Sequence, residues 1–138
     1  MTNQKKLEHA IEFALANKPA VGGFPFLAEF LRQAGVTHNL WSLPSAQSVY
    51  VMPGGSIVNQ GTPLVTGITE VPEFNQEALI QALRTDQAGE STFPQFLSAA
   101  WQAGVVHYDV DFVARTVTYY GVNKESYTES YPAVEVMQ

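Results

Sequence analysis

Hydrophobic residues follow a helical period in two separate parts of the chain. The positions spaced as one helix face are Leu7, Ile11, Ala14 and Leu15 in the first part, and Ala78, Leu79, Ala82 and Leu83 in the second. A second helix is expected after each, beginning near a Phe-Pro pair at 24–25 and at 93–94, because proline fits the first turn of a helix. Gly35 and Gly104 follow these segments, where a glycine of positive φ commonly ends a helix.

A pattern typical of a β-hairpin follows each of these glycines. In the second half, Tyr108, Val110 and Phe112 alternate with polar residues at 107, 109 and 111, and residues 115–120 return with strong β-formers. In the first half, strands are expected over 36–43 and 47–52. A further extended segment is expected near Pro63 and near Pro132. Helices followed by strands in each half predict an α+β fold with an antiparallel sheet and helices packed on it.

The two halves share residues at a constant offset. Gln33-Ala34-Gly35-Val36 and His38 recur 69 positions later as Gln102-Ala103-Gly104-Val105 and His107, and the ungapped offset gives twelve identities in all. We interpret this pattern as a tandem repeat of residues 1–69 and 70–138. Because a half of that size forms only a marginal core, we expect a single domain, 1–138, in which two pseudo-symmetric α-α-β-β-β halves merge.

Composition and charge narrow the classes of partner. Net charge is −6, with +1 on residues 1–69 and −7 on residues 70–138, so the chain lacks the basic field that nucleic acid or an anionic membrane surface attracts. We therefore expect neither nucleic acid nor membrane as a partner. The absence of cysteine excludes disulfides and thiolate metal sites. No segment has the roughly 20 apolar residues of a membrane span, and we expect a cytoplasmic protein.

One strand carries a candidate metal site. His107, Asp109 and Asp111 lie at i, i+2 and i+4, so all three point to one face of the strand, and imidazole and carboxylate groups are ligands of divalent ions. The same pattern is also typical of the solvated face of a hairpin, with Arg115 opposite an aspartate. The first half keeps His38 but has Leu40 and Ser42 at the positions matching the aspartates. The sequence leaves open whether a divalent metal binds at this strand, and it predicts no other cofactor.

Histidines and aromatic residues give a second candidate site. His38 and His107 are equivalent in the repeat and are expected to face each other across the axis that relates the halves, where paired histidines would act in acid-base chemistry or bind metal. Both are also candidate ligand-binding residues. Tyr119 and Trp41 are candidates for an aromatic-lined ligand cleft. Each of these residues has an equally simple structural use, in strand hydrogen bonding or in the sheet core.

Several longer segments resemble a known family. FPFLAEFLRQAGVTHNLWSLPSAQSVYV, QGTPLV, ALRTDQAGESTFPQFL and GVVHYDVDFVARTVTYYG closely resemble the YbcV-like family of small uncharacterised bacterial proteins, often labelled phage envelope protein. The resemblance covers nearly the whole chain. It implies a bacterial, prophage-associated origin, and it implies no activity, substrate, cofactor or catalytic residue.

The sequence supports three readings of function. No local motif orders a nucleophile with a base, which favours a non-enzymatic cytoplasmic accessory protein that binds a small ligand or a protein partner between the halves. One alternative is a metal-dependent enzyme that uses His107, Asp109 and Asp111. The other, suggested by the family label, is a structural protein of a phage or prophage particle. Whether the chain forms a homodimer stays open.

Overall fold

A computed structural model describes residues 1–136, which form four helices and six strands. The first unit consists of α1 (Asn3–Asn17), α2 (Gly23–Gln33), β1 (His38–Ser42), β2 (Gln47–Val51) and β3 (Ile57–Gln60). The second consists of α3 (Gln76–Gln87), α4 (Phe93–Gln102), β4 (His107–Asp111), β5 (Thr116–Tyr120) and β6 (Ser126–Ser130). The predicted α+β class and the α-α-β-β-β order of each half are therefore confirmed.

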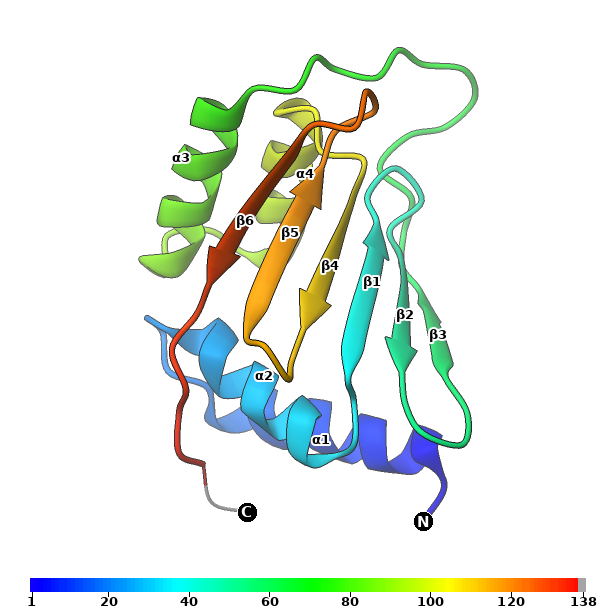
Figure 1. Ribbon diagram of the computed structural model, residues 1–138, viewed down its shortest axis with the longest axis vertical. Coiled ribbons are helices and arrows are strands. Elements are labelled where there is room, and N and C mark those ends of the chain that lie inside the picture. Colours follow the sequence, from blue (N-terminus) through cyan, green and yellow to red (C-terminus); the bar gives the residue numbers. More distant parts are fainter. Residues whose placement is uncertain (137–138) are drawn as a thin grey trace.

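The six strands form one antiparallel sheet in the order β3-β2-β1-β4-β5-β6 (Figure 1). The two units meet at the β1–β4 pair, which we call the seam. In this pair Leu40 lies opposite Asp109, and these two residues are 69 positions apart. Exchanging the two units therefore maps the strand pair onto itself, as a twofold axis between Leu40 and Asp109 would.

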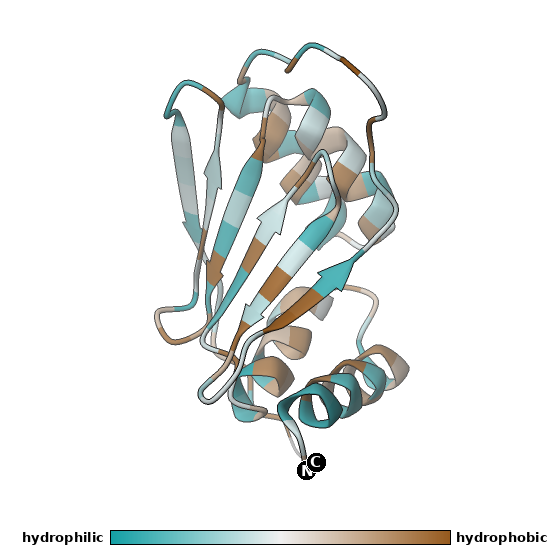
Figure 2. Cartoon of the chain, turned by 90° about the vertical axis from the view of Figure 1, so that its right-hand side faces the viewer, coloured by the Kyte–Doolittle hydropathy of each residue, from teal (hydrophilic) through white to brown (hydrophobic). Residues whose placement is uncertain are grey.

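Side chains alternate between two very different faces of the sheet. One face carries the buried residues of the strands, among them Tyr50, Tyr108, Val110 and Val117, and packs against the helices. The α1–α2 pair lies near one end of the strands and the α3–α4 pair near the other (Figure 1). Figure 2 shows both pairs on the same side of the sheet and the change of hydropathy along the strands. No helix within residues 1–136 covers the other face, which we call the uncovered face.

The ends of the predicted elements follow local chemistry. Gly35 and Gly104 have φ of +103° and +88°, so both adopt the left-handed conformation expected after a helix. The third strand of each unit ends shortly before a proline, at Gln60 before Pro63 and at Ser130 before Pro132, and proline has no N–H to contribute to a sheet. Within residues 1–136, every helix falls short of the length and apolar character that crossing a bilayer requires.

The start of α4 gives a first test of these local rules. The hydroxyl of Thr92 accepts a hydrogen bond from the backbone N–H of Gln95 at 3.3 Å, and the Gln95 side chain accepts one from the Thr92 N–H at 2.9 Å. Thr92→Ala removes this cap and is expected to lower the free energy of unfolding by about 1 kcal/mol. Urea titration measures this loss. Thr92→Ser keeps the hydroxyl, so its free energy of unfolding should stay close to that of the wild type, and equal losses in the two variants would contradict the capping role.

Candidate functional site

The uncovered face of the sheet is a grid of three rows that the strand registers define. The Ser42 row contains Ser126, Tyr120, His107, Ser42, Gln47 and Gln60. The Leu40 row contains Thr128, Thr118, Asp109, Leu40, Val49 and Val58. The His38 row contains Ser130, Thr116, Asp111, His38 and Val51. Each row crosses the seam, so each combines residues of both units.

The two units contribute different chemistry to this grid. In the Leu40 row, the first unit places Leu40, Val49 and Val58, whereas the second places Asp109, Thr118 and Thr128. On the neighbouring strands β5 and β6, the hydroxyl groups of Thr118 and Thr128 share a hydrogen bond of 2.9 Å between their Oγ1 atoms. The Leu40 row is therefore apolar on one side of the seam and polar on the other.

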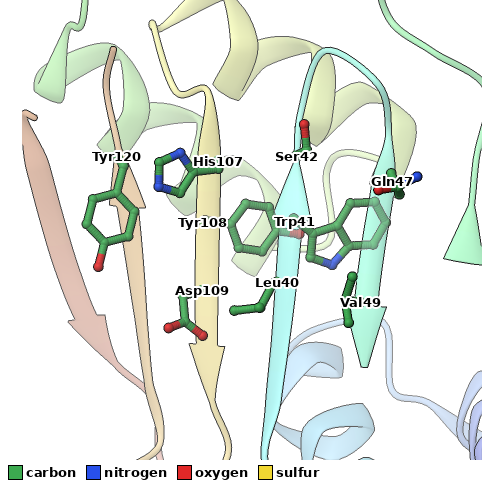
Figure 3. A pocket seen from close by; sticks show the side chains of 9 residues that line it. All are labelled: Leu40, Trp41, Ser42, Gln47, Val49, His107, Tyr108, Asp109 and Tyr120. Carbon is green, nitrogen blue, oxygen red and sulfur yellow. The ribbon is translucent and has the colours of Figure 1, made fainter. Parts of the chain in front are cut away.

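A hollow of about 440 Å³ lies on this face, over the seam and the strands on either side of it (Figure 3). It is lined by Leu40, Trp41, Ser42, Gln47, Val49, His107, Tyr108, Asp109 and Tyr120. Seven of these nine belong to the Ser42 and Leu40 rows. Trp41 and Tyr108 also border the hollow, but their side chains belong to the opposite face, where their rings stack with centroids 6.0 Å apart.

Two aromatic rings border the hollow on the side of the second unit. His107 and Tyr120 lie opposite each other on β4 and β5, and their rings stack with centroids 4.6 Å apart at 18°. Ser42 lies opposite His107 across the seam, and Gln47 lies opposite Ser42 on the next strand. These four side chains place hydrogen-bonding groups along one border, with the apolar Leu40 and Val49 beside them (Figure 3).

Asp109 brings a charge to the hollow at the middle of the seam. Its side chain is 35% exposed, and its Oδ1 lies 3.3 Å from Nδ1 of His38. The directly opposite residue, Leu40, is 42% exposed and carries no polar group. The carboxylate therefore has one histidine partner, from the other unit, and faces an apolar side chain across the strand pair.

The three residues predicted to bind metal share a face but have separate partners. His107 stacks on Tyr120, Asp109 contacts His38, and Asp111 accepts hydrogen bonds from the backbone N–H groups of Val113 and Ala114 at 3.0 and 2.9 Å. Asp111 thus holds the β4–β5 turn. Among the residues that the structure describes, no three His, Asp or Glu side chains gather in a way that could hold a metal ion.

The residues predicted to bind a ligand are divided between the two faces. His107 and Trp41 line the hollow, whereas His38 lies in the next row and reaches it only through Asp109. The expectation that His38 and His107 face each other is wrong, because the register places His38 opposite Asp111 and His107 opposite Ser42. In an antiparallel pair, equivalent residues meet only at the axis, and that position belongs to Leu40 and Asp109.

Tyr119 lies on the helix side of the sheet and is only 5% exposed. Its ring packs against Tyr108 with centroids 5.3 Å apart, and burial raises the pKa of its hydroxyl well above the ordinary value. Its neighbour Tyr120 faces the hollow instead. The lining residues that the sequence did not single out as ligand-binding are Leu40, Ser42, Gln47, Val49, Tyr108 and Tyr120.

A second polar cluster lies outside the hollow and has a structural role. Arg84 on α3 donates two hydrogen bonds to the carboxylate of Glu129 on β6, at 3.0 and 2.6 Å, and the Tyr127 hydroxyl donates a third at 2.5 Å. The Arg84 guanidinium holds the pKa of Glu129 below its usual range. These hydrogen bonds fasten the edge strand β6 to the helix α3.

Comparison with known proteins gives the family of this two-unit α+β protein. A family described as "Protein of unknown function (DUF1398)" matches residues 15–130, and the chain belongs to it. Uncharacterized protein Rv2012 of Mycobacterium tuberculosis and uncharacterized protein Mb2035 of Mycobacterium bovis are each 51% identical over 129 residues, which cover 94% of this chain and 79% of theirs. These descriptions carry no activity and no phage or envelope label.

Proposed function

We propose that this chain is a cytoplasmic, non-enzymatic binding protein that takes a small organic ligand into the hollow at the seam. The observation that carries the proposal is the composition of the hollow. Apolar Leu40 and Val49 lie beside a short row of hydrogen-bonding side chains that includes Ser42, Gln47 and His107. Small-molecule sites are mostly apolar with a few placed polar groups, and this combination matches them.

The size of the hollow favours a small ligand over a protein partner. Its volume of about 440 Å³ falls within the range of roughly 300–1,000 Å³ that is usual for ligand pockets. Its lining comes from four adjacent strands of one sheet, which hold their side chains in fixed register. A site built on strands is more rigid than one built on loops, so little ordering accompanies binding.

NMR titration with small aromatic probes tests this proposal. Benzyl alcohol and benzylamine are added to ¹⁵N-labelled protein, and we expect amide shifts confined to residues of β1, β2, β4 and β5 that line the hollow. Leu40→Trp places a larger side chain in the hollow and should weaken binding of both probes at least about tenfold. Such a loss corresponds to about 1.4 kcal/mol of binding free energy.

A matched variant keeps this test specific. Val58→Trp makes a similar replacement in the same row, at a residue that is 59% exposed and lies outside the hollow, so it should leave both affinities at their wild-type values. Thermal unfolding of both variants checks that the sheet is intact. Shifts that fall outside the hollow, or binding that survives Leu40→Trp, would overturn the proposal.

A further inference from the structure

We infer that the hollow at the seam selects a cationic ligand, a small molecule with a protonated amine on an apolar or aromatic body. The inference rests on the proposed function and adds the class of ligand. Its basis is the charge of the lining: among the described residues that line the hollow, Asp109 is the one carboxylate and none is a lysine or arginine. An anionic ligand would meet this carboxylate without a fixed cation to offset it.

The carboxylate of Asp109 keeps a free acceptor. The contact with His38 involves Oδ1 and is long at 3.3 Å, and Oδ2 accepts no hydrogen bond from any residue in the described part of the chain. At 35% exposure the side chain is partly withdrawn from water. Hydrogen bonds to an ionised group are stronger than neutral ones, so an ammonium group gains more here than a hydroxyl group does.

The opposite side of the seam fixes the orientation of such a ligand. Leu40 occupies the position related to Asp109 by the repeat, and Val49 extends the apolar surface on the next strand. A ligand that spans the seam therefore places its apolar body over the first unit and its ammonium group at the second. Because the two units differ at this pair of positions, one end of the site is apolar and the other end is charged.

The field of the whole protein acts in the same direction. The second half carries a net charge of −7 and the chain −6. Asp111, two residues along the same strand, adds a second carboxylate near Asp109. Such a field raises the local concentration of cations and lowers that of anions, and it weakens as salt is added.

A pair of probes of equal size separates charge from shape. Benzylamine is protonated at neutral pH, and benzyl alcohol replaces its ammonium by a hydroxyl. We expect benzylamine to bind about fivefold more tightly than benzyl alcohol in low salt, as suits a partly exposed charge pair. Benzoate should bind more weakly than either. The dissociation constants come from the amide shifts of β1 and β4 in the full-length protein.

Substitution of the carboxylate gives the decisive comparison. Asp109→Asn keeps the size of the side chain and should lower the affinity for benzylamine to that for benzyl alcohol, with the alcohol unaffected. Glu90→Gln removes the same net charge at an exposed residue far along the chain from the hollow and should preserve the fivefold preference. A preference lost in both variants would reflect net charge alone and would overturn the inference.

The remaining outcomes distinguish this inference from the proposed function. If benzylamine and benzyl alcohol shift the hollow residues with equal affinity, the hollow binds ligands but does not select cations, and only the inference falls. If the preference for benzylamine survives Asp109→Asn, the inference also falls. If neither probe shifts the hollow residues, the proposed function itself is overturned.

Discussion

Gly104→Ala is expected to lower the free energy of unfolding by about 3 to 5 kcal/mol, far more than a helix-ending glycine normally contributes. Two costs combine at this position. The φ of +88° is unfavourable for any residue with a side chain. In addition, a Cβ atom would lie 2.5 Å from the carbonyl oxygen of Glu73 and from the backbone N and Cα of Phe74.

The backbone that blocks this methyl group cannot easily withdraw. Asn75, the next residue, donates its backbone N–H to the carbonyl of Ala103 at 2.8 Å, and its side chain caps α3 by accepting from the N–H of Ala78 at 3.0 Å. Moving residues 73–75 away from Gly104 would break the first contact and disturb the start of the helix. The methyl group therefore has to be accommodated by strain.

The repeat supplies the control at Gly35. This residue also follows a helix with positive φ, at +103°, but the nearest atoms to its Cβ position are side-chain carbons of Met52 and Pro53 at 4.0 Å. Gly35→Ala should therefore lower the free energy of unfolding by only about 1 kcal/mol, the cost of placing a side chain at a positive φ. Chemical denaturation of both variants measures the difference. Equal losses of stability would show that close packing on residues 73–74 does not matter.

Gly35 and Gly104 also show how far the sequence predicts the fold. Local signals indicated the helices, the glycines that end them and the paired strands of each hairpin, because these depend on spacing and on backbone preferences. The pairing of β1 with β4 is different, since it joins residues that are far apart in the chain, such as Leu40 and Asp109, and leaves no local signal. The approach of residues 73–74 to Gly104 is equally non-local. Gly35 and Gly104 stand in the same local sequence, so the sequence does not show that only one of them is closely packed.

The candidate site was predictable only in part, for the same reason. The chemistry of their side chains predicts His107, Asp109 and Trp41 as site residues, and all three border the hollow, Trp41 with its ring on the opposite face. The predicted ligand-binding residue Tyr119 faces the helices whereas its neighbour Tyr120 lines the hollow, because a shift of one residue along a strand exchanges the faces of the sheet. In the sequence, Leu40 is notable only because it stands where the repeat has Asp109. Its place opposite Asp109 depends on the register across the seam.

Phe112→Ala is the second variant with a large expected effect, a loss of about 3 to 5 kcal/mol in the free energy of unfolding. Phe112 follows the last residue of β4, is only 1% exposed, and belongs to the shared core beneath the sheet. Its backbone N–H donates to the carbonyl of Thr37, in the residue before β1, at 3.0 Å. This hydrogen bond ties the position to the other unit, so the surrounding residues cannot collapse fully into the space that the ring leaves.

The neighbouring residue provides the control for Phe112. Val113 lies in the β4–β5 turn and is 68% exposed, so Val113→Ala should change stability by less than about 0.5 kcal/mol. Urea unfolding followed by both fluorescence and circular dichroism measures the two variants under the same conditions. Because Phe112 lies where the units meet, we expect a single transition at a lower midpoint. Two separate transitions, or a loss no larger than that of Val113→Ala, would mean that the residue does not support a core common to both units.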